Sequence, residues 1–141
     1  VGHSLINPEI GAVGDVDTAV VTMIYADGKI AVIKNSRRAA YGYDQRIEIL
    51  GSEGLLQAEN IVENSVVKST KAGVLSAKPK YFFLERYVSA YTAEWDAFIK
   101  SMKENTIVPV TLEDGVAALA MAEAATLSQR TGKSIQLKEV L

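Results

Sequence analysis

The chain has 141 residues, 15 basic and 17 acidic side chains, a net charge of −2 and no cysteine. The charges are interspersed, so no basic stripe favours binding to nucleic acid or to an anionic membrane. Without cysteine there can be no disulfide and no thiolate ligand for a metal, and a cytoplasmic location is expected. The longest apolar run, Val116–Ala122, is far shorter than the roughly 20 residues that span a bilayer.

The first part of the chain is predicted to form strands. A short segment, Val1–Ile6, precedes a loop around Pro8. The β-branched run Asp17–Tyr25 is separated from Lys29–Ile33 by Asp27-Gly28, and this arrangement predicts an antiparallel hairpin, because glycine adopts positive φ without steric cost. Both faces of the first strand are apolar, which indicates cover on both faces of the sheet.

Two further hairpins are expected after this one. Apolar and charged side chains alternate in Arg46–Leu50, and Gly51–Gly54 predicts a turn. The segments Leu55–Asn60 and Ser65–Thr70 are interpreted as two more short strands, followed by a turn at Lys71–Gly73. Together the strands predict an antiparallel meander, and the length fits a single domain with one core.

The last part of the chain is predicted to be helical. Aromatic and apolar residues recur every three to four positions from Phe83 to Met102, which indicates an amphipathic helix whose stripe packs on the sheet. A capping pattern at Thr111–Asp114 begins a second helix. We expect this helix to run to about Thr131, with Gly132 as a left-handed stop.

The order of the elements indicates the fold class. Alanines give the second helix a thin surface that can approach the sheet or a neighbouring helix, and Ile135–Leu137 is predicted to be a last short strand. Strands followed by helices favour an α+β fold over an alternating parallel one. We expect a largely antiparallel open sheet with two main helices packed on one face. The other face would be available for oligomerisation, since large exposed apolar patches mark interfaces.

One polar stretch, Asn35–Arg46, interrupts the strand pattern. Two arginines, two tyrosines and one glycine fall within Arg37–Asp44. Connections that a rigid sheet positions often carry recognition residues, so a pocket or an interface is expected here. The alternatives are a sheet edge with packed rings and solvated charges, or an ion-pair network at a subunit contact, where exposed pairs contribute little.

Other candidates for chemistry are weaker. His3 is the single histidine, and no other residue completes a histidine-based metal site with it, so a structural role and no metal site are expected. Glu85 and Glu94 lie at different angles on the predicted helix, which argues against a catalytic carboxylate pair.

The segment Asn35–Gly54 resembles one found in bacterial inositol 2-dehydrogenases, of the glucose-fructose oxidoreductase, inositol dehydrogenase and rhizopine-catabolism superfamily. Further similar segments follow in the same order at Gly14–Ala19, Glu85–Tyr91 and Asp114–Ala125. The resemblance spans nearly the whole chain but only the carboxy-terminal part of the family's pattern. It implies that residues 1–141 are a single substrate-binding and oligomerisation domain, without the dinucleotide-binding Rossmann domain.

The resemblance also implies a reaction for the parent protein. Such an NAD-dependent inositol 2-dehydrogenase oxidises myo-inositol to 2-keto-myo-inositol while hydride passes to NAD. The family's catalytic Glu-Lys-Pro and Asp-x-x-x-His motifs have no match in this chain, and His3 lies after the position of the catalytic histidine. The glycine pairs Gly11/Gly14 and Gly51/Gly54 are interpreted as turn residues rather than a dinucleotide fingerprint. We therefore assign no catalytic or cofactor-binding residue here, and we expect the isolated chain to bind no NAD and to be inactive.

One site contribution follows from the resemblance by position. Tyr43 is the first candidate for binding myo-inositol or a similar polyol, and Tyr41 is the second. A phenol can donate to and accept from hydroxyl groups while its ring shapes the pocket. A homo-oligomer through the sheet face, a homotetramer in the parent enzyme, is also implied. Two other functions stay open, an oligomerisation scaffold and the same domain from a related sugar dehydrogenase.

Overall fold

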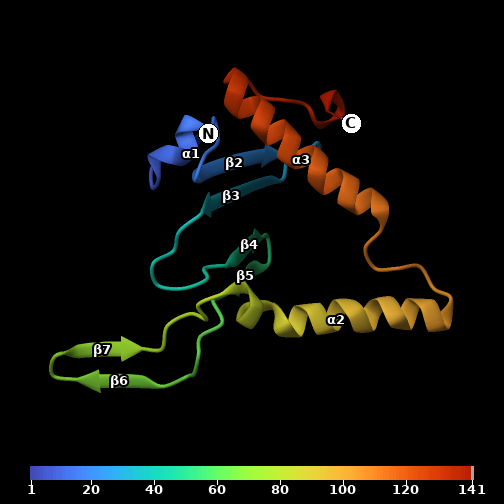
Figure 1. Ribbon diagram of the computed structural model, residues 1–141. Coiled ribbons are helices and arrows are strands. Elements are labelled where there is room, and N and C mark those ends of the chain that lie inside the picture. The colour runs from blue at the N-terminus through green and yellow to red at the C-terminus, as the bar shows by residue number, and fades with distance from the viewer. Residues whose placement is uncertain (141) are drawn as a thin grey trace. The chain divides into compact units, whose positions relative to one another are not determined.

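The computed structural model describes residues 1–140, and these form two compact units. The first unit contains residues 1–38 together with the described residues from Val108 onward, and the second contains Ala39–Ile107. A three-stranded sheet lies in the first unit, whereas the second holds two β-hairpins and a long helix (Figure 1). The organisation as a single domain stays a prediction.

The first unit is built on an antiparallel sheet. Its strands are, in order across the sheet, β1 (Gly2–His3), β2 (Thr18–Ile24) and β3 (Ile30–Ser36). The predicted hairpin is confirmed, because Ile24 lies opposite Ile30 and the Tyr25 N–H donates to the Lys29 carbonyl at 2.9 Å across the turn. Gly28 supplies the positive φ, 87°, that this turn requires.

The two faces of β2 differ in burial. Val21 and Met23 are half-buried on one face, whereas Val20 and Ile24 on the other face are 42% and 78% exposed. Cover of the second face is not seen within residues 1–140 and stays a prediction. The first unit has one long helix, which can cover one face of its sheet, so an apolar face stays open.

Between β1 and β2 the chain forms a short helix, α1 (Pro8–Ala12), where a loop was predicted. The Asn7 side chain accepts from the Glu9 N–H at 3.0 Å and caps the helix. Proline suits the first helical position because its φ is already helical and no amide hydrogen is needed there. The proline was therefore a helix start rather than a loop signal.

The second predicted helix is confirmed as α3 (Leu112–Thr131). Its capping box is complete, since the Thr111 hydroxyl accepts from the Asp114 N–H at 3.3 Å and the Asp114 carboxylate accepts from the Thr111 N–H at 2.8 Å. Gly132 ends the helix in the left-handed conformation, with φ of 68°. Ala120 is 4% exposed, so the alanine-rich face is the covered one.

The strand predicted at Ile135–Leu137 is wrong. The chain instead forms one turn of 3-10 helix, η1 (Leu137–Glu139). The backbone N–H of Gln136 donates to the Glu139 carboxylate at 2.9 Å and closes this turn. A local side-chain bond to the backbone therefore replaces the sheet pairing that a strand would need.

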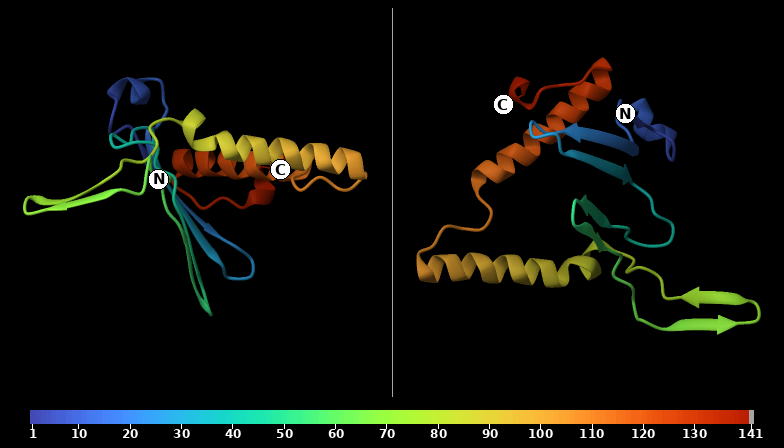
Figure 2. Two further views of the ribbon diagram at one scale, coloured as in Figure 1. Left: turned by 90° about the horizontal axis from the view of Figure 1, so that it is seen from below. Right: turned by 180° about the vertical axis from the view of Figure 1, so that it is seen from behind.

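The second unit contains two antiparallel hairpins. Their strands are β4 (Ile47–Gly51) with β5 (Gly54–Ala58), and β6 (Val67–Thr70) with β7 (Gly73–Ser76). The α+β class and the antiparallel pairing are confirmed, but the strands are divided among three sheets instead of one meander. β7 was not predicted, because an apolar run of only two residues after Gly73 is too short to indicate a strand. Within this unit the β6–β7 hairpin extends away from the helix (Figure 2).

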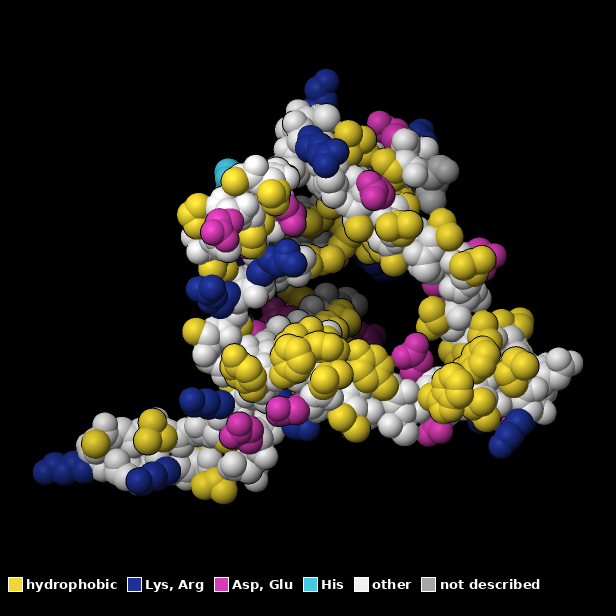
Figure 3. Space-filling view, in the orientation of Figure 1, with side chains coloured by type: hydrophobic (Ala, Val, Ile, Leu, Met, Phe, Trp, Pro, Cys, Tyr) yellow, Lys and Arg dark blue, Asp and Glu magenta, His cyan; other side chains and the backbone are white. Residues whose placement is uncertain are grey.

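The helix of the second unit is α2 (Phe83–Glu104), as the aromatic periodicity predicted. Phe83 and Tyr87 in its first turns are half-buried, but Trp95 is 63% and Met102 is 67% exposed. Within this unit, hairpin strands of four or five residues cannot cover a 22-residue helix, so packing of the whole stripe on the sheet stays a prediction. Figure 3 shows hydrophobic side chains gathered over α2. That both long helices pack on one sheet face stays a prediction.

Candidate functional site

The polar stretch after β3 is divided between the two units. Arg37 belongs to the first unit, where its guanidinium lies 3.7 Å from the Asp15 carboxylate. The tyrosine loop, Tyr41–Arg46, belongs to the second unit, where Arg46 pairs with Asp44 at 2.8 Å. Arg37 and Arg46 thus pair with different carboxylates, and an ion-pair network at a subunit contact stays an alternative interpretation.

A close approach of two backbones places the tyrosine loop. Gly42 is buried with φ of 137°, and a Cβ there would lie 2.7 Å from the Pro79 carbonyl oxygen. The N–H of Tyr43 donates to the Lys80 carbonyl at 2.8 Å, and the N–H of Lys80 donates to the Ile61 carbonyl at 2.9 Å. The chain around Lys80 therefore lies between the loop and the segment after β5, and glycine is required where the loop touches it.

The carboxylate of Asp44 gathers the side chains of the loop. It accepts two hydrogen bonds from the Arg46 guanidinium at 2.8 and 2.9 Å, one from the Asn60 amide at 2.9 Å and one from the Tyr41 hydroxyl. These bonds hold the pKa of Asp44 well below its usual value, with Arg46 as the largest cause. The same carboxylate raises the pKa of Tyr41, because it disfavours a phenolate beside it.

Tyr43, the first substrate-binding candidate, packs against α2. Its ring meets that of Tyr87 edge to face, with centroids 5.6 Å apart and planes at 79°, an arrangement typical of aromatic pairs. The Tyr87 hydroxyl donates to the side-chain carbonyl of Gln45 at 2.7 Å. The pKa of Tyr87 is raised, first by hydrogen bonding with the Tyr43 hydroxyl and then by burial. The two phenols are therefore neighbours in a half-buried cluster.

The structure brings both predicted tyrosines into one site, but they differ in exposure and in hydrogen bonding. Tyr41 is 52% exposed and its hydroxyl is engaged by Asp44, whereas Tyr43 is half-buried against α2. Sequence reasoning did not single out Gln45, Asn60 or Tyr87. The first and last lie inside the quoted loop and a quoted similar segment, so a signal existed, whereas Asn60 carried none.

The chemistry available at this site is hydrogen bonding rather than proton abstraction. Phenol, amide and guanidinium groups offer donors and acceptors to a polyhydroxylated ligand. The carboxylate of Asp44 is a poor base, because its pKa is lowered and its oxygens are engaged. His3 lies in the other unit and is exposed. No group of three or more His, Asp or Glu residues within residues 1–140 could hold a metal ion.

A second carboxylate, in the first unit, is bound mainly by backbone. Asp17 is 3% exposed and accepts hydrogen bonds at 2.8–2.9 Å from the N–H groups of Leu5, Ile6 and Asn7 and from the Thr18 hydroxyl. Burial alone would raise the pKa of Asp17, but these bonds outweigh it and lower the pKa to about 2. This residue fastens the segment after β1 to the start of β2.

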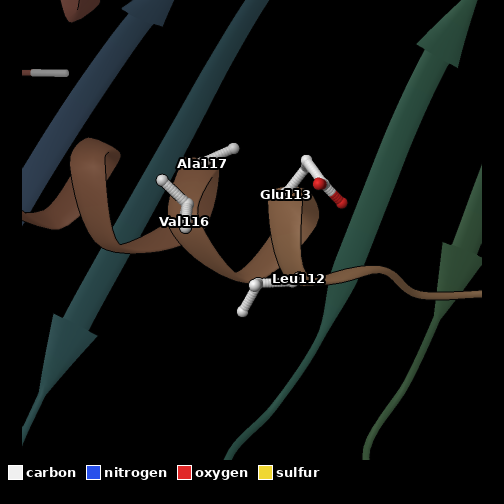
Figure 4. Close-up of a pocket in the computed structure, with 4 residues that line it drawn as sticks. All are labelled: Leu112, Glu113, Val116 and Ala117. Atoms are coloured by element: carbon white, nitrogen blue, oxygen red, sulfur yellow. The ribbon is translucent and has the colours of Figure 1, made fainter.

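A shallow hollow at the start of α3 has no comparable chemistry. It is lined by Leu112, Glu113, Val116 and Ala117, all from the first turns of one helix (Figure 4). Glu113 is the one polar side chain among these four. No helix in the described part of the chain is both long and apolar enough to cross a membrane.

Comparison with known proteins identifies the family of this chain. A family model described as "Oxidoreductase family, C-terminal alpha/beta domain" matches residues 4–137. The myo-inositol 2-dehydrogenase of Thermotoga maritima is 46% identical over 99% of this chain and 42% of the relative. The inositol 2-dehydrogenase of Rhizobium meliloti is 41% identical over 94% of this chain and 40% of the relative. The chain thus spans about two fifths of the length of these relatives.

Solved structures agree with the sequence relatives. The crystal structure of a probable dehydrogenase from Thermotoga maritima has a TM-score of 0.96 at 46% identity, covering 99% of this chain and 42% of that one. A scyllo-inositol dehydrogenase from Lactobacillus casei, with bound NAD(H) and scyllo-inositol, has a TM-score of 0.88 at 27% identity, covering 98% and 41%. The resemblance to inositol 2-dehydrogenases is confirmed. The chain therefore belongs to the oxidoreductase family and matches its C-terminal alpha/beta domain.

Proposed function

We propose that this chain is the carboxy-terminal domain of an NAD-dependent inositol 2-dehydrogenase, which oxidises myo-inositol to 2-keto-myo-inositol. The observation that carries the proposal is the tyrosine loop, where phenols, an amide and a guanidinium meet around Asp44. The 46% identity to a relative named myo-inositol 2-dehydrogenase supports the substrate. The relative that holds NAD(H) and scyllo-inositol supports the cofactor and the class of substrate.

Within this function Tyr43 is the principal polyol-binding residue and Tyr41 the second. The backbone of Tyr43 is held by Lys80 and its ring by Tyr87, so little conformational entropy is lost when its phenol binds a ligand. The hydroxyl hydrogen of Tyr41 is already donated to Asp44, so this phenol offers its lone pairs to a polyol hydroxyl. The two tyrosines thus orient the substrate, and neither removes a proton from it.

The NAD cofactor does not fit the residues of this chain. Every strand pair within residues 1–140 is antiparallel, whereas a dinucleotide fold needs parallel strands and a glycine-rich turn that opens a helix. Gly11 lies inside the five-residue α1, and Gly51 and Gly54 close the β4–β5 hairpin. We therefore assign NAD to a part of the enzyme outside this chain, and the isolated chain is expected to be inactive.

Homo-oligomerisation through the open face of the β2–β3 sheet is part of the proposal, with a homotetramer as the expected form. Cross-strand pairing places Val20, Ile24, Ile30 and Val32 on this face, and all four are exposed. The same face carries polar residues such as Thr22 and Lys34, but exposed apolar side chains grouped in this way are typical of an interface. A cytoplasmic location is also proposed, because the chain has no cysteine that an oxidising compartment would pair.

The experiment is an assay of the full-length protein that contains this chain, with myo-inositol and NAD. We expect oxidation by the wild type and a KM for the polyol about 3- to 10-fold higher in Tyr43→Phe, the cost of one neutral hydrogen bond. Tyr25→Phe, in the turn between β2 and β3, is the matched control and should change nothing. Unchanged kinetics in Tyr43→Phe would favour the scaffold function. A better substrate among other sugars would favour a related sugar dehydrogenase.

A further inference from the structure

The tyrosine loop closes on a single amide side chain, that of Asn60. This residue follows β5 and is half-buried. Its Oδ1 accepts from the backbone N–H of Gln45 at 2.8 Å, and its Nδ2 donates to the Asp44 carboxylate at 2.9 Å. One amide therefore holds two consecutive residues of the loop.

The two partners fix the orientation of this amide. If it were turned over, its oxygen would face the Asp44 carboxylate and its NH₂ group would face the Gln45 N–H, and both contacts would be repulsive. An aspartate at position 60 would keep the first bond and lose the second, because a carboxylate has no donor. The position therefore calls for a short primary amide rather than for any polar residue.

Tyr41 is linked to this amide through one residue and Tyr43 through two. Asp44 binds the Tyr41 hydroxyl. Gln45 binds the hydroxyl of Tyr87, whose ring meets the Tyr43 ring at a centroid distance of 5.6 Å. A substitution of Asn60 would therefore change the positions of both candidate phenols while leaving the two tyrosines themselves unchanged in the sequence.

The backbone beside Asn60 is itself anchored. The next residue, Ile61, accepts from the Lys80 N–H at 2.9 Å, and the Glu63 N–H donates to the Lys78 carbonyl at 3.0 Å. Lys80 also accepts from the N–H of the first candidate tyrosine at 2.8 Å. The amide and the loop are thus attached to the same short segment, which keeps their spacing constant.

We propose that Asn60 is a positioning residue for polyol binding, whose amide holds the tyrosine loop in the conformation that presents Tyr41 and Tyr43. This role rests on the proposed function, because it takes the ligand of the loop to be a polyol. Asn60 acts through Asp44 and Gln45 and has no contact with the substrate.

The test is Asn60→Asp in the full-length protein, with Asn64→Asp as the matched control. Asn64 is exposed, and its side-chain oxygen accepts from the Val66 N–H at 2.9 Å, a bond that aspartate keeps. In Asn60→Asp two carboxylates face each other, and we expect a KM for myo-inositol roughly tenfold higher at pH 8, with a smaller change in kcat. The control should match the wild type.

The pH dependence separates positioning from a general loss of structure. The charged groups near position 60 are Asp44 and Arg46 of the loop and the adjacent Glu59, which acts on Arg46. Facing carboxylates share a proton at lower pH, since like charges raise one pKa of the pair. The shared proton restores a donor, so the KM of Asn60→Asp should recover toward the wild-type value as the pH falls. Asn60→Ala adds no charge, and its KM should be raised at every pH.

A second measurement does not depend on turnover. Tryptic cleavage after Arg46, followed by mass spectrometry under native conditions, reports how often the loop opens. It should be several-fold faster in Asn60→Asp than in the wild type or in Asn64→Asp. Active enzyme whose Asn60→Asp form has the KM and cleavage rate of the control would overturn this role and leave the proposed function intact. A wild type that oxidises no polyol would overturn the proposed function and this role with it, and the cleavage rates would still report whether Asn60 holds the loop.

Discussion

Asp17 in the first unit and Asp44 in the second each accept four hydrogen bonds, but from different kinds of donor. Three of the bonds to Asp17 come from backbone N–H groups of consecutive residues, and this side chain is almost fully buried. All four bonds to Asp44 come from side chains, and its own side chain is 17% exposed. Both carboxyl groups have lowered pKa values.

The kind of donor decides what each carboxylate can do. A carboxylate bound to consecutive backbone N–H groups fixes the path of the chain, because those donors belong to the main chain. A carboxylate bound to side chains fixes the directions in which those side chains point. The same side chains can still contact a ligand through their remaining donors and acceptors. We therefore expect Asp17 to matter for stability and Asp44 to matter for recognition.

The largest effect is expected at Gly42, where the loop around Asp44 touches the backbone of Pro79. An alanine there would combine a left-handed φ of 137° with a Cβ 2.7 Å from a carbonyl oxygen. We expect Gly42→Ala to lower the free energy of unfolding by about 2 kcal/mol or more, measured by urea denaturation. Gly51→Ala is the control, since its Cβ would meet one atom at 3.7 Å. Equal stability of the two variants would show that the loop is not held by this approach.

The next largest effect is expected when the two carboxylates are replaced in turn and the variants are compared. Asp17→Asn places an NH₂ group against backbone N–H donors, and we expect a melting temperature more than about 5 °C lower by calorimetry. Asp44→Asn should lower the melting temperature less but raise the KM for the polyol in the full-length enzyme, because the loop loses its ionic partner. An equal loss of stability in both variants would remove the distinction between a structural and a recognition carboxylate.

A smaller effect is expected from acid, which should weaken the contribution of Asp17 to stability. The pKa of Asp17 is lowered from 3.8 to about 2, so the unfolded chain binds the proton more readily than the folded one. The stability that this carboxylate contributes is therefore present above pH 3.8 and is lost as the pH falls toward 2. The difference in urea midpoint between the wild type and Asp17→Asn should be constant above about pH 5 and smaller at pH 3. A difference that stays constant in acid would contradict the lowered pKa.

Local signals allowed much of the fold to be predicted from the sequence. Asp27-Gly28 specified the β2–β3 hairpin, and Thr111 with Asp114 specified the start of α3, because each of these signals lies within a few residues of the structure that it forms. The division into three sheets was not predicted, since it depends on which strands meet across the long polar connections. The turn at the end of the chain was missed because an apolar pair outweighed a side-chain bond to the backbone.

The candidate site shows the same limit. The sequence indicated the tyrosine loop, because its composition breaks the strand pattern. It did not indicate that Asn60 contacts Gln45 across 15 positions, or that Tyr87, which the aromatic periodicity placed on the helix, contacts Gln45 across 42. Contacts over such separations are set by the path of the whole unit, and neither periodicity nor turn chemistry reports that path.

The smallest effect is expected from Tyr41→Phe. The phenol is half exposed, and Asp44 keeps its bonds to Arg46 and Asn60 when the hydroxyl is removed, so the free energy of unfolding should change by less than about 1 kcal/mol. The KM for the polyol should rise by no more than about threefold, less than in Tyr43→Phe, because the Tyr41 hydroxyl is shared with a carboxylate. Steady-state kinetics of the two variants in the full-length enzyme make this comparison. If Tyr41→Phe raised the KM as much as Tyr43→Phe, both phenols would contact the polyol equally, and Asp44 would support a substrate-binding group directly.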